Sequence, residues 1–142
     1  MAGYLVVAHQ TVGSAELRDR LTRIAHQDPE AAFTLLIPAT DPSHLLVWEA
    51  GDPQAIAERR ATEARDKLTQ AGLRISGTAV GDASPLQAIE DELREHPGAH
   101  DSVILCTLPP GMSHWLGLDV ASETEERLNI PVEHVVAGGP YR

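Results

Sequence analysis

The sequence predicts an α/β protein with a single, doubly wound, five-stranded parallel sheet and helices on both faces. Short apolar runs alternate along the chain with longer segments of helical periodicity, and this alternation is typical of a parallel sheet. The runs 4–8 (YLVVA) and 103–107 (VILCT) are apolar almost throughout, which indicates strands buried on both faces. Right-handed crossovers then favour the strand order 3-2-1-4-5.

The helix starts carry recognisable capping signals. Ser14 precedes the first helix, Asp52 and Pro53 open the second, and Ser84-Pro85 opens the third, with Gln87 placed to complete a capping box. The predicted strands are 4–8, 32–37, 73–80, 103–107 and 131–136, and the predicted helices are 15–26, 53–71, 85–96 and 119–128. The second helix is expected to pack on the sheet through Ala57, Ala61, Ala64, Leu68 and Ala71.

The chain length and composition favour one domain, residues 1–142, with no linker and no internal repeat. A formal net charge of −10 argues against binding to nucleic acid or to an anionic membrane, because both need a surplus of cations. We expect neither a signal peptide nor a membrane span. Cys106 is the only cysteine; it fits a cytoplasmic protein and is expected to be a core residue.

Ligands of open α/β sheets bind outside the carboxyl ends of the central strands. Here that crevice lies between 9–14 and 107–119. The hydroxyls and backbone N–H groups there can hold an anion, or they can simply cap the local turns and helices. Asp119 is expected to be the N-cap of the fourth helix. The candidate ligand-binding residues are His9, Gln10, Thr11, Gly13, Ser14, Thr107, Gly111, Ser113, His114 and Asp119.

Other chemistries lack support in the sequence. No Ser-His-Asp order, no paired catalytic carboxylates and no glycine-rich dinucleotide fingerprint are present. His9, His44 and His114 could converge near the crevice, but their spacing is not that of metal ligands, so no metal site is expected. The apolar run 45–48 (LLVW), in a long connection, is expected to pack over the crevice or in a subunit contact.

The segment 111–116 (GMSHWL), with Val120 and the later Ile130-Pro131-Val132, resembles the universal stress protein family, and 107–116 (TLPPGMSHWL) resembles an actinobacterial branch of it. The resemblance extends over nearly the whole chain. It implies the adenine nucleotide alpha hydrolase-like fold of that family. It also implies a homodimer formed through the last strand, Val132–Val136, which would lie at an edge of the sheet.

The ATP-binding members of this family carry glycines that would fall on Leu105, Leu108 and Leu118, and an Asp that would fall near His9. The chain therefore resembles a divergent member without the ATP-binding glycine motif. The resemblance implies binding of a small molecule or regulation, rather than turnover. The alternative is a nucleotide-binding protein or weak nucleotide hydrolase that uses a divergent loop, with an adenine nucleotide or a small anion as ligand.

Overall fold

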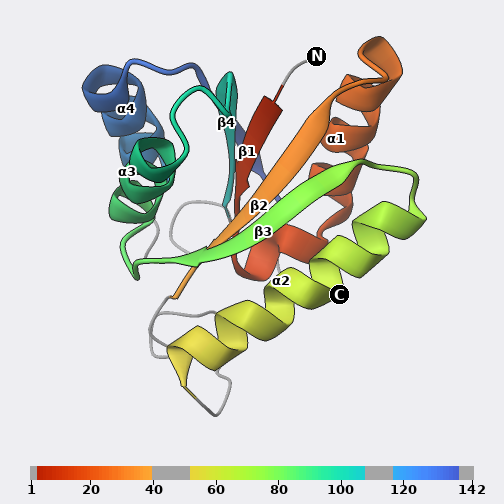
Figure 1. The fold of residues 1–142 in the computed structure, drawn as a ribbon, viewed down its shortest axis with the longest axis horizontal. Coiled ribbons are helices and arrows are strands. Elements are labelled where there is room, and N and C mark those ends of the chain that lie inside the picture. Colours follow the sequence, from red (N-terminus) through yellow and green to blue (C-terminus); the bar gives the residue numbers. More distant parts are fainter. Residues whose placement is uncertain (1–2, 40–51, 108–116, 138–142) are drawn as a thin grey trace.

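The computed structural model describes residues 3–39, 52–107 and 117–137. The strands form one parallel sheet in the order β3-β2-β1-β4-β5, which confirms the predicted topology (Figure 1). The predicted run 45–48 lies outside the described residues. The strands are β1 (Gly3–Val7), β2 (Ala32–Pro38), β3 (Ile75–Gly81), β4 (Ser102–Thr107) and β5 (Val132–Val136).

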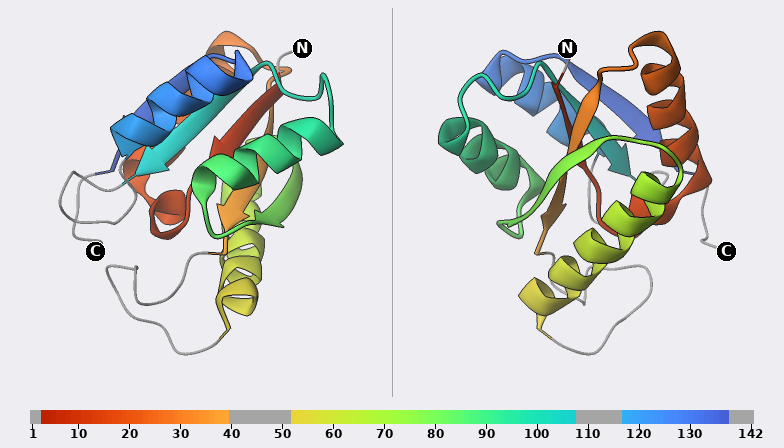
Figure 2. Two further views of the ribbon diagram at one scale, coloured as in Figure 1. Left: turned by 90° about the vertical axis from the view of Figure 1, so that its left-hand side faces the viewer. Right: turned by 45° about the vertical axis from the view of Figure 1, so that its right-hand side comes forward.

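Helices cover both faces of the sheet, as Figure 2 shows. The first pair, α1 (Ala15–Gln27) and α2 (Pro53–Gln70), packs on one face, and α3 (Pro85–Glu95) and α4 (Gly117–Leu128) pack on the other. A short 3-10 helix, η1 (Gln10–Gly13), joins β1 to α1 where the sequence suggested only a turn. Among the described residues, no helix is both long enough and apolar enough to cross a bilayer.

The central strand β1 sends alternate side chains into two separate hydrophobic clusters. Val6 and Ala8 pack with residues of α1 and α2, whereas Leu5 and Val7 pack with residues of α3. All four side chains are at most 1% exposed. The continuous apolar run of the sequence therefore reflects a strand that is buried on both faces.

The small residues of α2 allow this helix to approach the sheet closely. Four of the five predicted contact residues are buried, but Ala71 is exposed because the helix ends at Gln70. Gly72 has a φ of +92°, which turns the chain out of the helix at the place that the glycine indicated. Ile56, in the first turn of α2, is also buried, although the prediction omitted it.

The capping box predicted for α3 is only half formed. The Ser84 hydroxyl accepts a hydrogen bond from the Gln87 backbone N–H, as expected of an N-cap. The Gln87 side chain, however, donates to the carboxylate of Asp91 at 2.8 Å instead of reaching back to Ser84. The Ser84 N–H is already bonded to Asp82 Oδ1 at 2.9 Å, so a nearer carboxylate has replaced the Gln87 amide.

The two edge strands are β3 and β5, as predicted. β3 alternates between more and less exposed residues over its first half, as expected for a strand at the edge. β5 is tied to α1 by an ion pair between Arg20 and Glu133, in which Nη2 donates to Oε1 at 2.8 Å. This pair fixes the first helix against the last strand, far away in the sequence.

Two glycines of β3 provide a matched test of how closely α3 packs on the sheet. A Cβ at Gly81 would lie 2.6 Å from the Cβ of Ala88 on α3, whereas a Cβ at Gly77 would meet no described atom within 4 Å. We therefore expect Gly81→Ala to lower the free energy of unfolding by about 1–3 kcal/mol through overpacking. Gly77→Ala should leave it within about 0.5 kcal/mol of wild type, or raise it. Urea denaturation measures the free energy of unfolding of both variants. Equal free energies for the two would contradict the close packing of α3 on Gly81.

Candidate functional site

The candidate crevice lies where β1 and β4 end side by side. β1 pairs with β2 on one side and with β4 on the other, so the connections that leave β1 and β4 diverge at this point. Figure 1 shows β1 and β4 as neighbours at the centre of the sheet. The described residues of the crevice come from η1, from the start of α1 and from the ends of these two strands.

The Thr11 and Ser14 hydroxyls, which we expected to bind a ligand on the β1 side of the crevice, form hydrogen bonds within the protein. Thr11 Oγ1 donates to the backbone carbonyl of Cys106 at 2.7 Å, and Thr11 is buried. Ser14 Oγ accepts a hydrogen bond from the Leu17 N–H and so caps α1, as the sequence predicted. The Thr11 bond holds η1 against the end of β4, and the Ser14 bond caps α1, so both hydroxyls have a structural role that competes with ligand binding.

Cys106 lies below these hydroxyls as a fully buried side chain, which confirms the prediction of a core residue. Its Sγ atom is 4.0 Å from Ser14 Oγ. Burial raises the pKa of the thiol, although hydrogen bonds from Thr11 and Ser14 act in the opposite direction. A thiol with a raised pKa carries little thiolate at neutral pH, which makes it a poor nucleophile.

Thr107, at the end of β4, pairs with a residue that the sequence analysis did not identify. Thr107 Oγ1 lies 2.6 Å from Nε2 of His134 on β5. Burial lowers the pKa of His134, which favours the neutral imidazole in this pair. The signal for this contact is the parallel register of β4 and β5, in which Leu105 pairs with His134, and the sequence alone does not give that register.

His9, directly after the end of β1, has the most unusual environment in the crevice. Its side chain is 3% exposed, and neither ring nitrogen has a hydrogen-bond partner among the residues that the structure describes. Burial, together with the positive charge of Arg60 on α2, lowers the pKa of His9 to about 4. A neutral imidazole is thus held in a buried place next to the candidate crevice, and its donor and its acceptor are both unused by the described residues.

The structure gives less information about the remaining candidate residues. Gly111, Ser113 and His114 lie outside the described residues, and Gln10 contributes backbone to η1. Asp119 is not an N-cap, because α4 already begins at Gly117 and Asp119 lies inside its first turn.

Gly13 opens onto a groove of about 220 Å³ between the start of α1 and the end of α2. Arg18 and Lys67 line this groove and supply two cations that the sequence analysis did not single out. The volume is smaller than the roughly 300–1,000 Å³ of sites for drug-sized ligands. It suits a small anion better than a whole nucleotide.

Comparison with solved structures shows what the fold is similar to. A crystal structure of a protein from the universal stress protein family of Burkholderia pseudomallei matches this chain with a TM-score of 0.55. The match has 14% sequence identity and covers 94% of each chain. The chain has a universal stress protein-like fold. No protein-family model and no curated protein matches the sequence, so the relationship concerns the fold alone.

The environment of His9 predicts a specific dependence of stability on pH. The folded-state pKa of His9 is about 4, below the ordinary value of 6.5. Between pH 4 and pH 6.5, His9 is therefore mostly protonated in the unfolded chain but neutral in the folded chain. Protonation of the unfolded chain lowers the free energy of unfolding. The contribution of His9 to that free energy is complete above pH 6.5 and is lost as the pH falls towards 4. We expect His9→Leu to become more stable relative to wild type on acidification, by about 2–3 kcal/mol between pH 7 and pH 4.5.

Urea unfolding of both proteins at the two pH values measures this difference. His26→Leu serves as the control, because His26 is exposed on α1 and its replacement should give no such change. A difference between wild type and His9→Leu that is the same at pH 7 and pH 4.5 would contradict the buried, neutral state of His9.

Proposed function

We propose that this chain is a cytoplasmic binding or regulatory protein with a universal stress protein-like fold, and that it does not bind ATP in the usual way of that family. The observation that carries this proposal is His9. In the ATP-binding members that the sequence resembles, an Asp stands near this place and meets the adenine. An Asp carboxylate only accepts hydrogen bonds, whereas the buried, neutral imidazole of His9 has one N–H donor and one acceptor nitrogen.

The engagement of the nearby hydroxyls supports binding rather than turnover. Thr11, Ser14 and Thr107 each form a hydrogen bond within the protein, and Cys106 is a buried thiol with a raised pKa. The described part of the crevice therefore contains no accessible nucleophile next to a base. The ligand class that fits His9 is a small polar molecule that both donates and accepts hydrogen bonds, such as a heterocyclic base or a small anion.

A nucleotide-binding protein with weak hydrolase activity is the second candidate function. Two observations favour it: the Thr107–His134 contact at 2.6 Å has the spacing of a hydroxyl and its general base, and Arg60 brings a positive charge near His9. Thr107 is as deeply buried as His9. Its hydroxyl, unlike the His9 ring nitrogens, is already hydrogen-bonded within the described part of the chain, so a substrate would have to displace His134. We therefore place this candidate second.

We predict that the protein does not bind Mg-ATP tightly. The glycines that would admit the phosphates are absent, and Asp119 lies in the first turn of α4, where a carboxylate disfavours an anion. Isothermal titration calorimetry should give a dissociation constant weaker than the low micromolar range, which corresponds to about −8 kcal/mol. Asp119→Ser should tighten the residual binding. A wild-type constant in the low micromolar range or below, with phosphate released from the bound ATP, would support the second candidate instead.

The proposal includes a homodimer through β5. This strand lies at the edge of the sheet, where its outer backbone groups can pair with another chain. Val136 is 43% exposed and is the most prominent exposed apolar side chain of the described residues. Val135, in contrast, packs in part against the core under α1 and α2. An isologous contact between two β5 strands would cover Val136 in both subunits.

Val136→Lys tests this contact without disturbing the core. We expect the wild type to be a dimer at micromolar concentrations and the variant to be largely monomeric, because the contact would bury a lysine ammonium group in each subunit in place of an apolar side chain. Light scattering after size-exclusion chromatography measures the mass. Thr78→Lys, on the exposed part of the opposite edge strand β3, is the matched control and should remain dimeric. A dimeric Val136→Lys protein would show that β5 is not the interface.

A further inference from the structure

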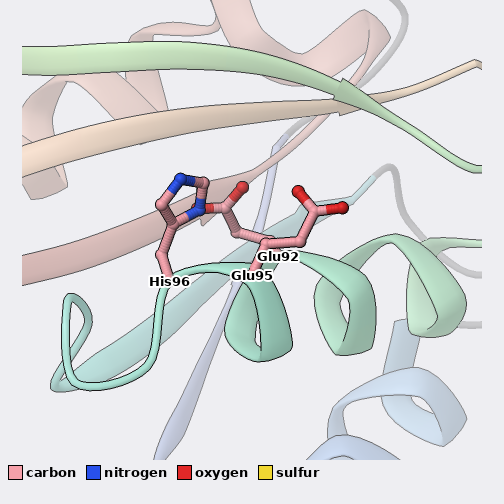
Figure 3. Close-up of side chains that lie close together, drawn as sticks. All are labelled: Glu92, Glu95 and His96. Atoms are coloured by element: carbon pink, nitrogen blue, oxygen red, sulfur yellow. The ribbon is translucent and has the colours of Figure 1, made fainter.

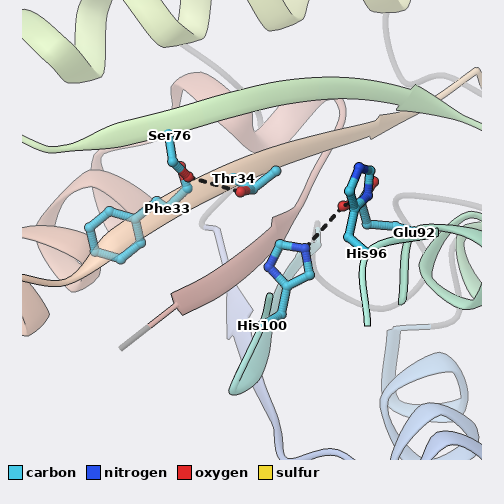
Figure 4. A network of polar contacts seen from close by, with 6 residues as sticks. All are labelled: Phe33, Thr34, Ser76, Glu92, His96 and His100. Carbon is cyan, nitrogen blue, oxygen red and sulfur yellow. Dashed lines mark hydrogen bonds and ion pairs between the residues drawn. The ribbon is translucent and has the colours of Figure 1, made fainter. Parts of the chain in front are cut away.

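A cluster of histidine and glutamate side chains lies at the end of α3, away from the crevice. One oxygen of Glu92, Oε2, lies 2.9 Å from Nδ1 of His96 and 3.0 Å from Nε2 of His100. Figure 4 shows His96 and His100 converging on Glu92 from two different segments, the end of α3 and the connection to β4. Glu92 is 7% exposed and the His100 side chain 4%, so a carboxylate is buried between two imidazoles.

Glu95 adds a second carboxylate to this cluster. One potential ligand atom from each of Glu92, Glu95 and His96 lies within 4.8 Å of the other two. Figure 3 shows these three side chains together on the last turn of α3. In contrast to Glu92, both Glu95 and His96 are exposed, so they can adjust their rotamers at little cost.

The surroundings of the cluster are acidic. Glu92 and Glu95 line a groove of about 310 Å³ between α3 and β3, and Asp82 and Asp91 line the same groove. Arg94 is the nearest cation on α3, and it is already paired with Asp91. The groove therefore carries a surplus of negative charge, which attracts a cation and disfavours an anion.

We propose that Glu92, Glu95 and His96 bind a divalent zinc-class cation, with the buried His100 as a fourth ligand or as the hydrogen-bond partner of Glu92. Histidine nitrogen and carboxylate oxygen are ordinary zinc ligands, at about 2.0–2.2 Å from the metal. Four such ligands in a tetrahedron stand about 3.4 Å apart. The present separations of 2.9 Å to less than 4.8 Å bracket this value, so small movements of the exposed side chains complete the site.

The chemistry of the donor set selects the class of metal. A mixture of imidazole and carboxylate suits zinc and its transition-metal neighbours, whereas calcium and magnesium prefer oxygen ligands alone. His100 precedes β4 by two positions, and β4 ends at Thr107, about 16 Å further along the strand. The cluster is thus separate from the crevice, and the cation site does not depend on the proposed function of that crevice.

A zinc-binding experiment with tag-free protein tests the proposal. Zn²⁺ affinity is measured by competition with a chromophoric chelator, and Co²⁺ absorption reports the coordination geometry. We expect one equivalent of Zn²⁺ to bind the wild type, and His96→Gln and Glu95→Gln each to weaken this binding about tenfold or more. Both substitutions lie at exposed positions, so they should preserve the fold, which circular dichroism verifies.

His26→Gln and Glu63→Gln are the matched controls, since they remove the same groups from exposed positions on α1 and α2. They should bind Zn²⁺ like the wild type. Zn²⁺ should also raise the Tm of the wild type but not that of His96→Gln, because a ligand that binds only the folded state stabilises it. A wild type that binds no Zn²⁺, or His96→Gln and Glu95→Gln proteins that bind it unchanged, would overturn the proposal and leave a hydrogen-bonded cluster that only anchors the end of α3.

Discussion

The burial of β1 on both faces is the constraint on which the rest of the structure depends. Leu5 and Val7 need apolar partners on one side of the sheet, and Val6 and Ala8 need them on the other. Hydrophobic burial of this extent requires helices on both faces and strands on both edges of β1. The chain meets this requirement by winding in opposite directions from the centre, which gives the order β3-β2-β1-β4-β5. The same winding leaves a crevice where β1 and β4 end.

Most of the fold could be predicted because its signals are local. An apolar run indicates a buried strand, and Ser14 or Asp52 before a helical pattern indicates an N-cap, whatever the rest of the chain does. The capping box of α3 was predicted wrongly because two local hydrogen bonds of Gln87 compete. Gln87 could have bonded to Ser84 or to a carboxylate on its own helix, and the structure selects the carboxylate. The 3-10 helix η1 was missed because its short i→i+3 bonds carry no distinct sequence signal, and the bond between Thr11 and Cys106 that supports it joins distant segments.

The candidate site was predictable in its position but not in the state of its side chains. The switch point follows from the topology, so His9, Thr11 and Ser14 could be placed there from the sequence. Whether a hydroxyl faces a ligand or a neighbouring strand depends on contacts between segments far apart in the chain. The partner of Thr107, for instance, is His134, and only the pairing of β4 with β5 brings the two together. The Glu92 cluster, in contrast, has a local signal, because Glu92, Glu95 and His96 are three and four positions apart and so share one face of a helix, but the sequence alone does not show that Glu92 is buried.

His9 and Glu92 illustrate two opposite solutions for a buried ionisable group. Glu92 keeps its carboxylate buried with two imidazoles against it, so the polar group is satisfied and helps to anchor α3. His9 is buried with no hydrogen-bond partner in the described part of the chain, and it is held neutral by that burial and by Arg60. A buried polar group without partners lowers the stability of the fold by about 1–3 kcal/mol. For His9 this cost falls directly after the end of β1, next to the candidate crevice, where a ligand that paired with the imidazole would remove it.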